Sequence, residues 1–304
     1  MIVTGMEEIL KHTATLPTST STVGPIPTVI PGDQPIVQHI HDTGKRTLWV
    51  VVIFMAISSL AFYSLAARVR VQTRLLHTLT ALITTVSFLS YLAMATGEGV
   101  TYKHSIVHHP HKHVPDTHQE YLRQIFWVRY LNWIITTPLI LINIALLGGL
   151  SGANLVVTIA ADLIMFAAGL TATFAHDERR WVWYTIVIIS FLTIAFQVGV
   201  NGARSVRRGA DQRRALFTSF VGANLLVFLL YPIILAASPL SQRIGVDAET
   251  IAWAVHDILT QGLFGYWLLL GHDTSETAQL VVDGFWSHGI SHEGAIRVGE
   301  TDGA

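Results

Sequence analysis

The sequence predicts an all-α membrane protein, a bundle of seven transmembrane helices. Of its 304 residues, 51% are hydrophobic and only 13% are charged, a balance typical of chains that lie in lipid. Seven apolar segments follow a polar N-terminal stretch, and each is close to the ~20 residues that span a bilayer. The formal net charge of −1 argues against nucleic acid as a partner. We therefore expect the lipid bilayer as the main partner, with protein partners or a homo-oligomer left open.

The apolar segments set the domain organisation. They lie at about residues 47–67, 75–97, 121–147, 152–175, 181–202, 215–238 and 250–271. Residues 1–45 are polar and rich in Thr, Ser and Pro, so we expect a disordered extracellular tail without a cleavable signal peptide. Residues 46–272 then form the seven-helix domain, and residues 273–304 form a cytoplasmic tail.

Arginines in two linkers indicate the orientation. Eight of them follow the first and fifth segments: Arg68, Arg70, Arg74, Arg204, Arg207, Arg208, Arg213 and Arg214. Cytoplasmic loops carry an excess of basic residues, so we place this side in the cytoplasm, although seven basic residues on the other side weaken the bias. The N-terminus is then outside, the C-terminus is cytoplasmic, and we expect the plasma membrane.

The third segment carries a polar stripe within an apolar helix. Its members fall at helical offsets of 3, 4, 7 and 14 from the first: Arg129, Asn132, Trp133, Thr136 and Asn143. Polar groups in a membrane helix face the protein interior rather than hydrocarbon. This stripe therefore marks the centre of the bundle.

Two acids lie inside later segments. Asp257 is one helical turn before Gln261, and an unpaired buried aspartate would cost several kcal/mol, so we expect Arg129 as its partner. This pair is either a polar staple between helices or part of an ion path. For Asp162 in the fourth segment, we expect a hydrogen bond to a hydroxyl of the second or third helix.

A histidine-rich stretch joins the second and third segments. It holds His104, His108, His109, His111, His113 and His118. Alternate residues of an extended chain face one side, so His109, His111 and His113 can gather on a transition metal such as Zn²⁺ or Cu²⁺. The alternative is a solvated, weakly basic loop without metal.

Four motifs together resemble the microbial rhodopsin family. They are Arg-Tyr-x-Asn-Trp-x-x-Thr-Thr-Pro-Leu from Arg129, Asp162 with Met165 and Gly169, Tyr231-Pro232, and Asp257. The run from Tyr91 to Gly97 is most similar to the fungal branch. The resemblance covers residues 47–272 and implies a seven-helix retinal protein that pumps ions, conducts them or senses light. It implies no enzyme.

The resemblance also exposes three departures. In the family, a lysine four residues after the helix-seven aspartate forms the retinal Schiff base, and this sequence has Gln261 there. An amide has no basic amine to condense with an aldehyde, so we expect no covalent retinal and do not expect retinal as a cofactor. Asn132 and Asn143 stand where pumping relatives carry the proton-accepting and proton-donating carboxylates, and neither side chain titrates.

The resemblance supplies a list of candidate site residues. Positions that match the retinal cavity are Tyr91, Trp133, Thr137, Met165, Gly169, Phe228, Tyr231, Pro232, Asp257 and Gln261. The expected polar network consists of Arg129, Asn132, Asn143, Asp162, Glu249 and Asp257. Phe228 stands where the family usually has a tryptophan, and Glu249 matches a member of the family's proton-release group.

Three functions remain open on this sequence. The first is a photochemically silent, lysine-lacking opsin-related protein with a stress-associated or regulatory role. The second is a receptor-like protein that binds retinal or another apolar ligand without a covalent bond. The third is a passive ion or proton path through Arg129, Asp257 and Glu249. Fold resemblance alone does not decide between them.

Overall fold

The computed structural model describes residues 35–69, 74–109, 117–176, 178–206 and 211–273. The chain divides into two compact units. One comprises residues 37–105 and 122–304 and holds the helix bundle, and the other comprises residues 1–36 and 106–121. The bundle unit contains the candidate site residues that the helices carry.

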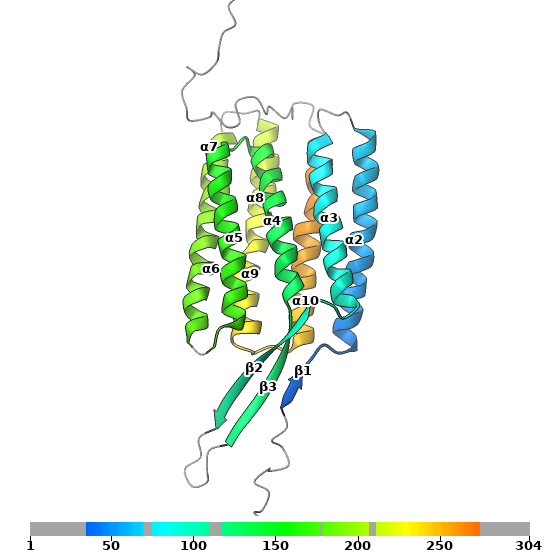
Figure 1. Ribbon diagram of the computed structural model, residues 1–304. Coiled ribbons are helices and arrows are strands. Elements are labelled where there is room, and N and C mark those ends of the chain that lie inside the picture. The colour runs from blue at the N-terminus through cyan, green and yellow to red at the C-terminus, as the bar shows by residue number, and fades with distance from the viewer. Residues whose placement is uncertain (1–34, 70–73, 110–116, 177, 207–210, 274–304) are drawn as a thin grey trace, which may run out of the picture. The chain divides into compact units, whose positions relative to one another are not determined.

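The described part of the chain forms a bundle of seven helical rods (Figure 1). Four are single helices: α2 (Asp42–Arg68), α3 (Arg74–Ala95), α4 (Trp127–Gly148) and α5 (Gly152–Phe174). The fifth joins α6 (Arg179–Ala195), η1 (Phe196–Asn201) and α7 (Gly202–Val206), and the sixth comprises α8 (Asp211–Phe228), α9 (Leu230–Leu235) and η2 (Ala236–Leu240). The seventh joins α10 (Val246–Asp257), η3 (Ile258–Leu263) and α11 (Phe264–Asp273).

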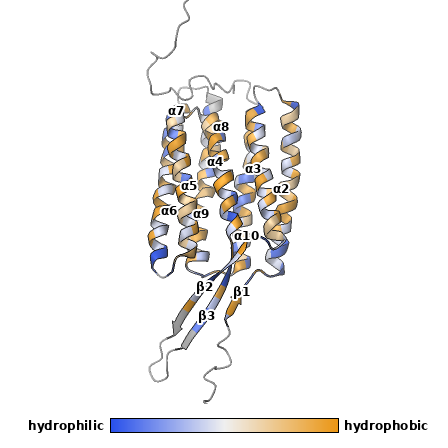
Figure 2. Cartoon of the chain, in the orientation of Figure 1, coloured by the Kyte–Doolittle hydropathy of each residue, from blue (hydrophilic) through white to orange (hydrophobic). Residues whose placement is uncertain are grey.

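The rods have the length and apolarity of membrane spans. Among the described residues, the first six each qualify by composition and length, and the seventh runs without a break from Val246 to Asp273. Hydrophobic residues cover most of the helix lengths, and hydrophilic ones gather at their ends (Figure 2). On α2, Val50, Ile53, Ile57 and Leu60 form an exposed apolar stripe at helical spacing, as expected for a face that meets lipid. The prediction of a seven-helix membrane bundle is confirmed.

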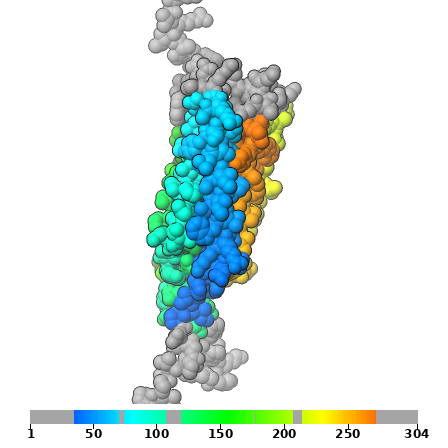
Figure 3. Space-filling view, turned by 90° about the vertical axis from the view of Figure 1, so that its right-hand side faces the viewer, coloured from blue at the N-terminus to red at the C-terminus, as the bar shows by residue number. Residues whose placement is uncertain are grey.

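The first and last rods close the bundle. Helix α2 packs against α3 on one side and against α10 and η3 on the other, and Figure 3 shows the blue first helix beside the orange last one. Helix α4 packs against both α3 and α5 and is the most buried of the spans. The polar stripe that begins at Arg129 therefore lies in the interior, as predicted.

A small sheet adds to the predicted all-helical fold. It contains β1 (Ile36–Gln38), β2 (Val100–His109) and β3 (Thr117–Phe126), in the order β1-β3-β2. Strand β2 follows α3, and β3 leads directly into α4. We call this end of the bundle the sheet-side end, and we call the end where α2 stops and α3 starts the far end.

Three predicted boundaries were wrong. The third span begins at Trp127 rather than at residue 121, because residues 117–126 pair as a strand and carry Glu120 and Arg123, which a lipid-spanning start would exclude. The seventh rod begins at Val246 rather than at residue 250. The predicted tail of residues 1–45 ends earlier, because β1 and the first turn of α2 occupy part of it.

Candidate functional site

The carboxylate of Asp257 is the centre of the site. It is 0% exposed and lies at the C-terminal end of α10. Its Oδ2 accepts a hydrogen bond from the Tyr91 hydroxyl at 2.6 Å, and its Oδ1 accepts from the indole N–H of Trp133 at 2.8 Å. His256 Nδ1 lies 3.1 Å from the same Oδ1. These bonds compensate a buried carboxylate that would be costly without partners.

The side chain of Gln261 is fixed by hydrogen bonds at both of its polar atoms. Its Nε2 donates to Asp257 Oδ1 at 3.3 Å, and its Oε1 accepts from Asn132 Nδ2 at 3.2 Å and from the Ser87 hydroxyl. The residue lies in the π-helical turn η3, a kind of distortion that is frequent at functional sites. The amide thus links α3, α4 and the last rod at mid-bundle.

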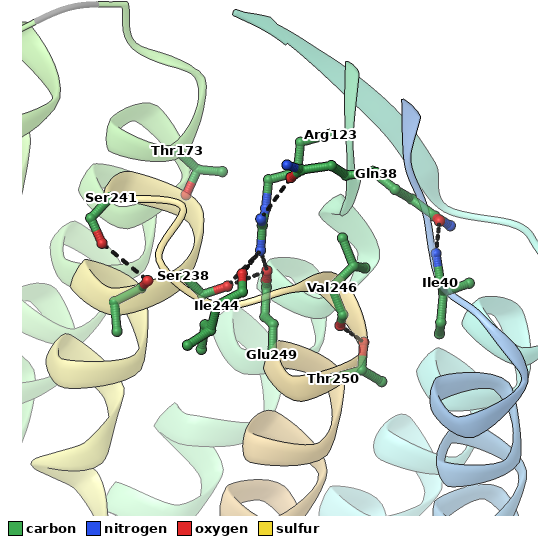
Figure 4. A network of polar contacts seen from close by, with 12 residues as sticks. Gln38, Ile40, Arg123, Thr173, Ser238, Ser241, Ile244, Val246, Glu249 and Thr250 are labelled. Carbon is green, nitrogen blue, oxygen red and sulfur yellow. Dashed lines mark hydrogen bonds and ion pairs between the residues drawn. The ribbon is translucent and has the colours of Figure 1, made fainter. Parts of the chain in front are cut away.

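Arg123 of β3 connects several elements at the sheet-side end through hydrogen bonds (Figure 4). The guanidinium is 1% exposed, and its Nη2 donates to Glu249 at 2.7 Å, to the Ser238 hydroxyl at 2.8 Å and to the Ile244 carbonyl at 3.0 Å. Its Nη1 donates to Gln38 Oε1 at 3.0 Å. Ser238 also donates to Glu249 at 2.5 Å. One side chain therefore connects β1, η2 and α10.

The expected pairing of Arg129 with Asp257 was wrong. The ion pair of Arg129 is with Glu249, whose Oε1 lies 3.6 Å from Nη1. Nε and Nη2 of Arg129 are buried and have no hydrogen-bond partner among the described residues. Glu249 binds Arg123 more closely than Arg129, and this leaves Asp257 to the neutral donors around it.

A small cavity lined by aromatic side chains lies beside Gln261. It is lined by Trp133, Thr137, Met165, Phe166, Phe228, Tyr231, His256, Thr260 and Gln261. The indole of Trp133 contacts the rings of Phe166 at 5.6 Å and Tyr231 at 5.3 Å between centroids. Six predicted pocket residues are thus brought to one cavity: Trp133, Thr137, Met165, Phe228, Tyr231 and Gln261. Tyr91, Pro232 and Asp257 are not among its lining residues, and Gly169 lies against the Tyr231 hydroxyl, which a side chain at position 169 would meet.

The far half of the bundle contains a second small cavity. Gln261 and Thr260 line both cavities, and Asn143 lines the second one. The Asn143 amide nitrogen donates to the Thr80 hydroxyl at 3.4 Å, and its oxygen has no partner among the described residues. Asn132 thus bonds Gln261 directly, and Asn143 shares the second cavity with it.

Asp162 does not make the predicted hydrogen bond. It is fully buried on α5, and neither carboxyl oxygen has a hydrogen-bond partner among the described residues. The helix places it one turn before Met165 and Phe166, whose side chains line the aromatic cavity. Asp162 therefore belongs to the surroundings of the cavity and is not part of the network around Asp257.

The metal prediction falls largely outside the described structure. His111 and His113 are not described, and His104, His108, His109 and His118 lie on β2 and β3. Within the ranges that are described, no three His, Asp or Glu side chains are placed to hold a metal ion. Binding of Zn²⁺ or Cu²⁺ by this stretch stays a prediction.

Sequence reasoning missed Arg123 and His256 as site residues. Arg123 was hidden because its segment was taken as the start of a helix. His256 was overlooked because adjacent residues on a helix point in different directions, and only the position of α8 shows that its ring meets that of Phe228. The signal for both was present, because a charged or titratable side chain beside a membrane span indicates a buried partner.

Seven membrane-spanning rods around a buried aspartate and an aromatic cavity define a class of seven-helix membrane proteins with a central ligand site. Comparison with known proteins identifies the family. The family described as "Bacteriorhodopsin-like protein" matches residues 43–275. The chain belongs to this family of microbial rhodopsins.

Individual relatives agree with this assignment. The chain is 41% identical over 288 residues to "Opsin-1" of Neurospora crassa, a match that covers 94% of each protein. The crystal structure of the light-driven proton pump LR (Mac) from Leptosphaeria maculans is similar with a TM-score of 0.77 at 41% identity, covering 79% of this chain and 98% of that one. The light-driven proton pump CsR from Coccomyxa subellipsoidea follows with a TM-score of 0.70 at 29% identity, covering 78% and 100%.

These comparisons correct the prediction about retinal. Because the chain belongs to the family and matches solved proton pumps over most of their length, retinal is the expected cofactor, and the prediction that excludes retinal was wrong. The aromatic walls at Trp133, Phe166 and Tyr231 suit a flat apolar polyene. Gln261 supplies no amine for the covalent link. The cavity walls therefore fit the apolar polyene of retinal, but Gln261 cannot form the imine.

Proposed function

We propose that this chain is a non-pumping, opsin-related membrane protein that holds retinal by non-covalent contacts and acts as a regulatory component of the membrane. The observation that carries the proposal is the hydrogen-bonded amide of Gln261, at the position that the family resemblance assigns to the lysine. A carboxamide nitrogen is not a nucleophile toward an aldehyde. The rings around Trp133 supply apolar contact area without it.

The two asparagines support the absence of pumping. Asn132 bonds Gln261 and Asn143 shares a cavity with it, at the positions where the resemblance places the groups that take up and release a proton in pumps. An amide neither gains nor loses a proton in the physiological range. We also propose that the sheet-side end faces outward, because the linkers with eight arginines join the rods at the far end. We propose no enzymatic reaction.

Purification from cells grown with retinal tests the proposal directly. Solvent extraction followed by mass analysis should release unmodified retinal in a stoichiometric amount, and borohydride treatment before extraction should leave no retinyl group on the protein. Retention of no retinal at all would overturn the ligand, and a reduced adduct on any peptide would overturn the non-covalent mode.

Vesicles that contain the purified protein test the absence of pumping separately. Illumination should produce no pH change beyond that of empty vesicles. A light-dependent pH change that an uncoupler abolishes would show that proton transport proceeds through groups other than Asn132 and Asn143.

A further inference from the structure

His256 lines the aromatic cavity and has a buried polar atom without a hydrogen-bond partner among the described residues. The residue is 5% exposed, and its ring lies between Phe228, with centroids 6.3 Å apart, and Trp253, at 5.8 Å. Its Nε2 is buried and has no hydrogen-bond partner among the described residues. Buried polar atoms are nearly always hydrogen-bonded, so a lone one in a cavity wall indicates a ligand contact.

The contact with Asp257 fixes which ring nitrogen carries the proton. Asp257 Oδ1 already accepts the Trp133 indole N–H at 2.8 Å, so this oxygen is an acceptor. His256 Nδ1 lies 3.1 Å from the same oxygen and can bond to it only as an N–H donor. Nδ1 is therefore protonated.

A neutral imidazole has a single N–H. With that proton on Nδ1, Nε2 carries a lone pair and acts as a hydrogen-bond acceptor. This acceptor is the atom that is buried without a partner among the described residues.

We propose that the cavity selects a retinoid-sized apolar molecule that ends in a hydroxyl group, and that this hydroxyl donates a hydrogen bond to His256 Nε2. The inference rests on the proposed function, since it assumes that the cavity holds a retinoid. The oxygen of an aldehyde only accepts and would face the lone pair of Nε2, whereas an alcohol can donate. The alcohol form of the ligand is thus favoured over the aldehyde form.

Two probes that differ by one hydrogen-bond donor test this selection. Purified full-length protein is titrated with retinol and with retinyl methyl ether, and the quenching of tryptophan fluorescence reports binding. We expect retinol to bind about tenfold more tightly, the ratio that corresponds to one hydrogen bond. In His256→Phe, which keeps a ring and loses the nitrogen, the two probes should bind equally.

Two further variants keep the test decisive if His256→Phe fails to fold. His256→Gln, which can present an amide oxygen near the position of Nε2, should retain a preference for retinol. Thr185→Val, at an exposed position of α6 whose hydroxyl bonds only within its own helix, should retain the full preference. Equal binding of both probes to the wild type, or a preference that survives in His256→Phe, overturns the inference.

The outcomes also separate this inference from the function on which it rests. If neither probe nor retinal binds, the proposed function itself has failed. If retinal binds more tightly than retinol and Tyr231→Phe removes that preference, the polar end of the ligand belongs at the Tyr231 hydroxyl, which also lines the cavity without a partner among the described residues. That result would overturn the assignment to His256 and leave non-covalent retinal binding intact.

Discussion

The two halves of the bundle differ in how their buried polar groups are satisfied. At the sheet-side end, Arg123 bonds Glu249, Ser238 and Ile244, and Asp257 accepts hydrogen bonds from four residues. In the far half, Asn143 makes one long contact to a hydroxyl beside a cavity. Charge-assisted bonds are stronger than neutral ones, so the sheet-side half is held by electrostatics and the far half by apolar packing.

This difference separates residues that stabilise the fold from a residue that bears on proton transfer. The charged half retains the partners that keep buried ions stable, so its residues are needed for folding. The far half is mainly apolar around its cavity and carries an amide at Asn143, which cannot relay a proton. Asn143 and the buried ion pair of Arg123 therefore lie in different halves and can be changed independently.

The largest expected effect is the appearance of colour in Gln261→Lys. The lysine amine would reach the region of Asp257, whose carboxylate can stabilise a protonated imine, and the aromatic walls remain in place. We expect a borohydride-sensitive visible band after retinal is added, and none in the wild type. Gln261→Arg is the matched control, since it adds length and charge without a primary amine. A colourless Gln261→Lys protein that is folded would show that the cavity is too filled to admit retinal.

The next effect is proton transport in that coloured background. Gln261→Lys alone should not acidify or alkalise the medium in light, because Asn132 cannot accept the imine proton. Adding Asn132→Asp should produce a light-dependent pH change, and Asn143→Asp should accelerate the cycle by supplying a donor on the other side. Pumping by Gln261→Lys without either aspartate would place the acceptor elsewhere, with Asp257 as the first candidate.

A third prediction compares the stability of the two halves directly. Arg123→Met leaves the buried Glu249 with Ser238 and a more distant Arg129, so we expect a loss of about 3–5 kcal/mol, the range for breaking a buried ion pair. Asn143→Leu, in the far half, should change stability by less than about 1 kcal/mol, because its oxygen has no partner to lose. Thermal unfolding in detergent measures both. Equal losses would remove the distinction between the halves.

Much of this arrangement could be predicted from the sequence. The seven spans follow from apolar length, and the buried stripe on α4 follows from helical spacing, because both depend on local pattern alone. The cavity residues followed from motif resemblance, and six of them line one cavity. Span length, helical spacing and short motifs are all properties of neighbouring residues in the chain, so they can be recognised in the sequence without knowing the tertiary structure.

The pairing of the buried charges could not be predicted in the same way. Arg123 lies 126 residues from Glu249 in the sequence, and their contact depends on how β3 meets the end of the sixth rod and the start of α10. Helical spacing alone cannot predict whether Arg123 or Arg129 lies closer to Glu249, because both side chains are long enough to reach it. The three-stranded sheet was missed for a related reason, because strand pairing depends on a partner segment rather than on the strand's own composition.

Lys103 of β2 gives the smallest predicted effect and tests the sheet-side half from its edge. Its ammonium donates to the carbonyls of Thr173 at 2.5 Å and Ala175 at 3.1 Å, at the C-terminal end of α5. Desolvation by burial, together with the positive charges of Arg180 and Arg123, lowers the pKa of Lys103 from 10.5 to about 8. The folded protein therefore releases this proton at a lower pH than the unfolded chain does.

The sign of the pH dependence is set by that difference. Between about pH 8 and pH 10.5, the unfolded chain holds the proton and the folded chain does not, so stability should rise with pH in this window and level off above it. Allowing for solvent screening, we expect a contribution on the order of 1 kcal/mol.

The measurement is the difference in thermal midpoint between the wild type and Lys103→Met, which should change in favour of the wild type as the pH is raised from about 7.5 to about 10.5. Lys45→Met, which removes an exposed lysine on α2, is the control and should change the thermal midpoint little, as surface substitutions usually do. If the difference for Lys103→Met is constant, Lys103 stays protonated throughout this pH range in the folded protein. The carbonyls at the end of α5 would then stabilise the ammonium more than Arg180 and Arg123 destabilise it.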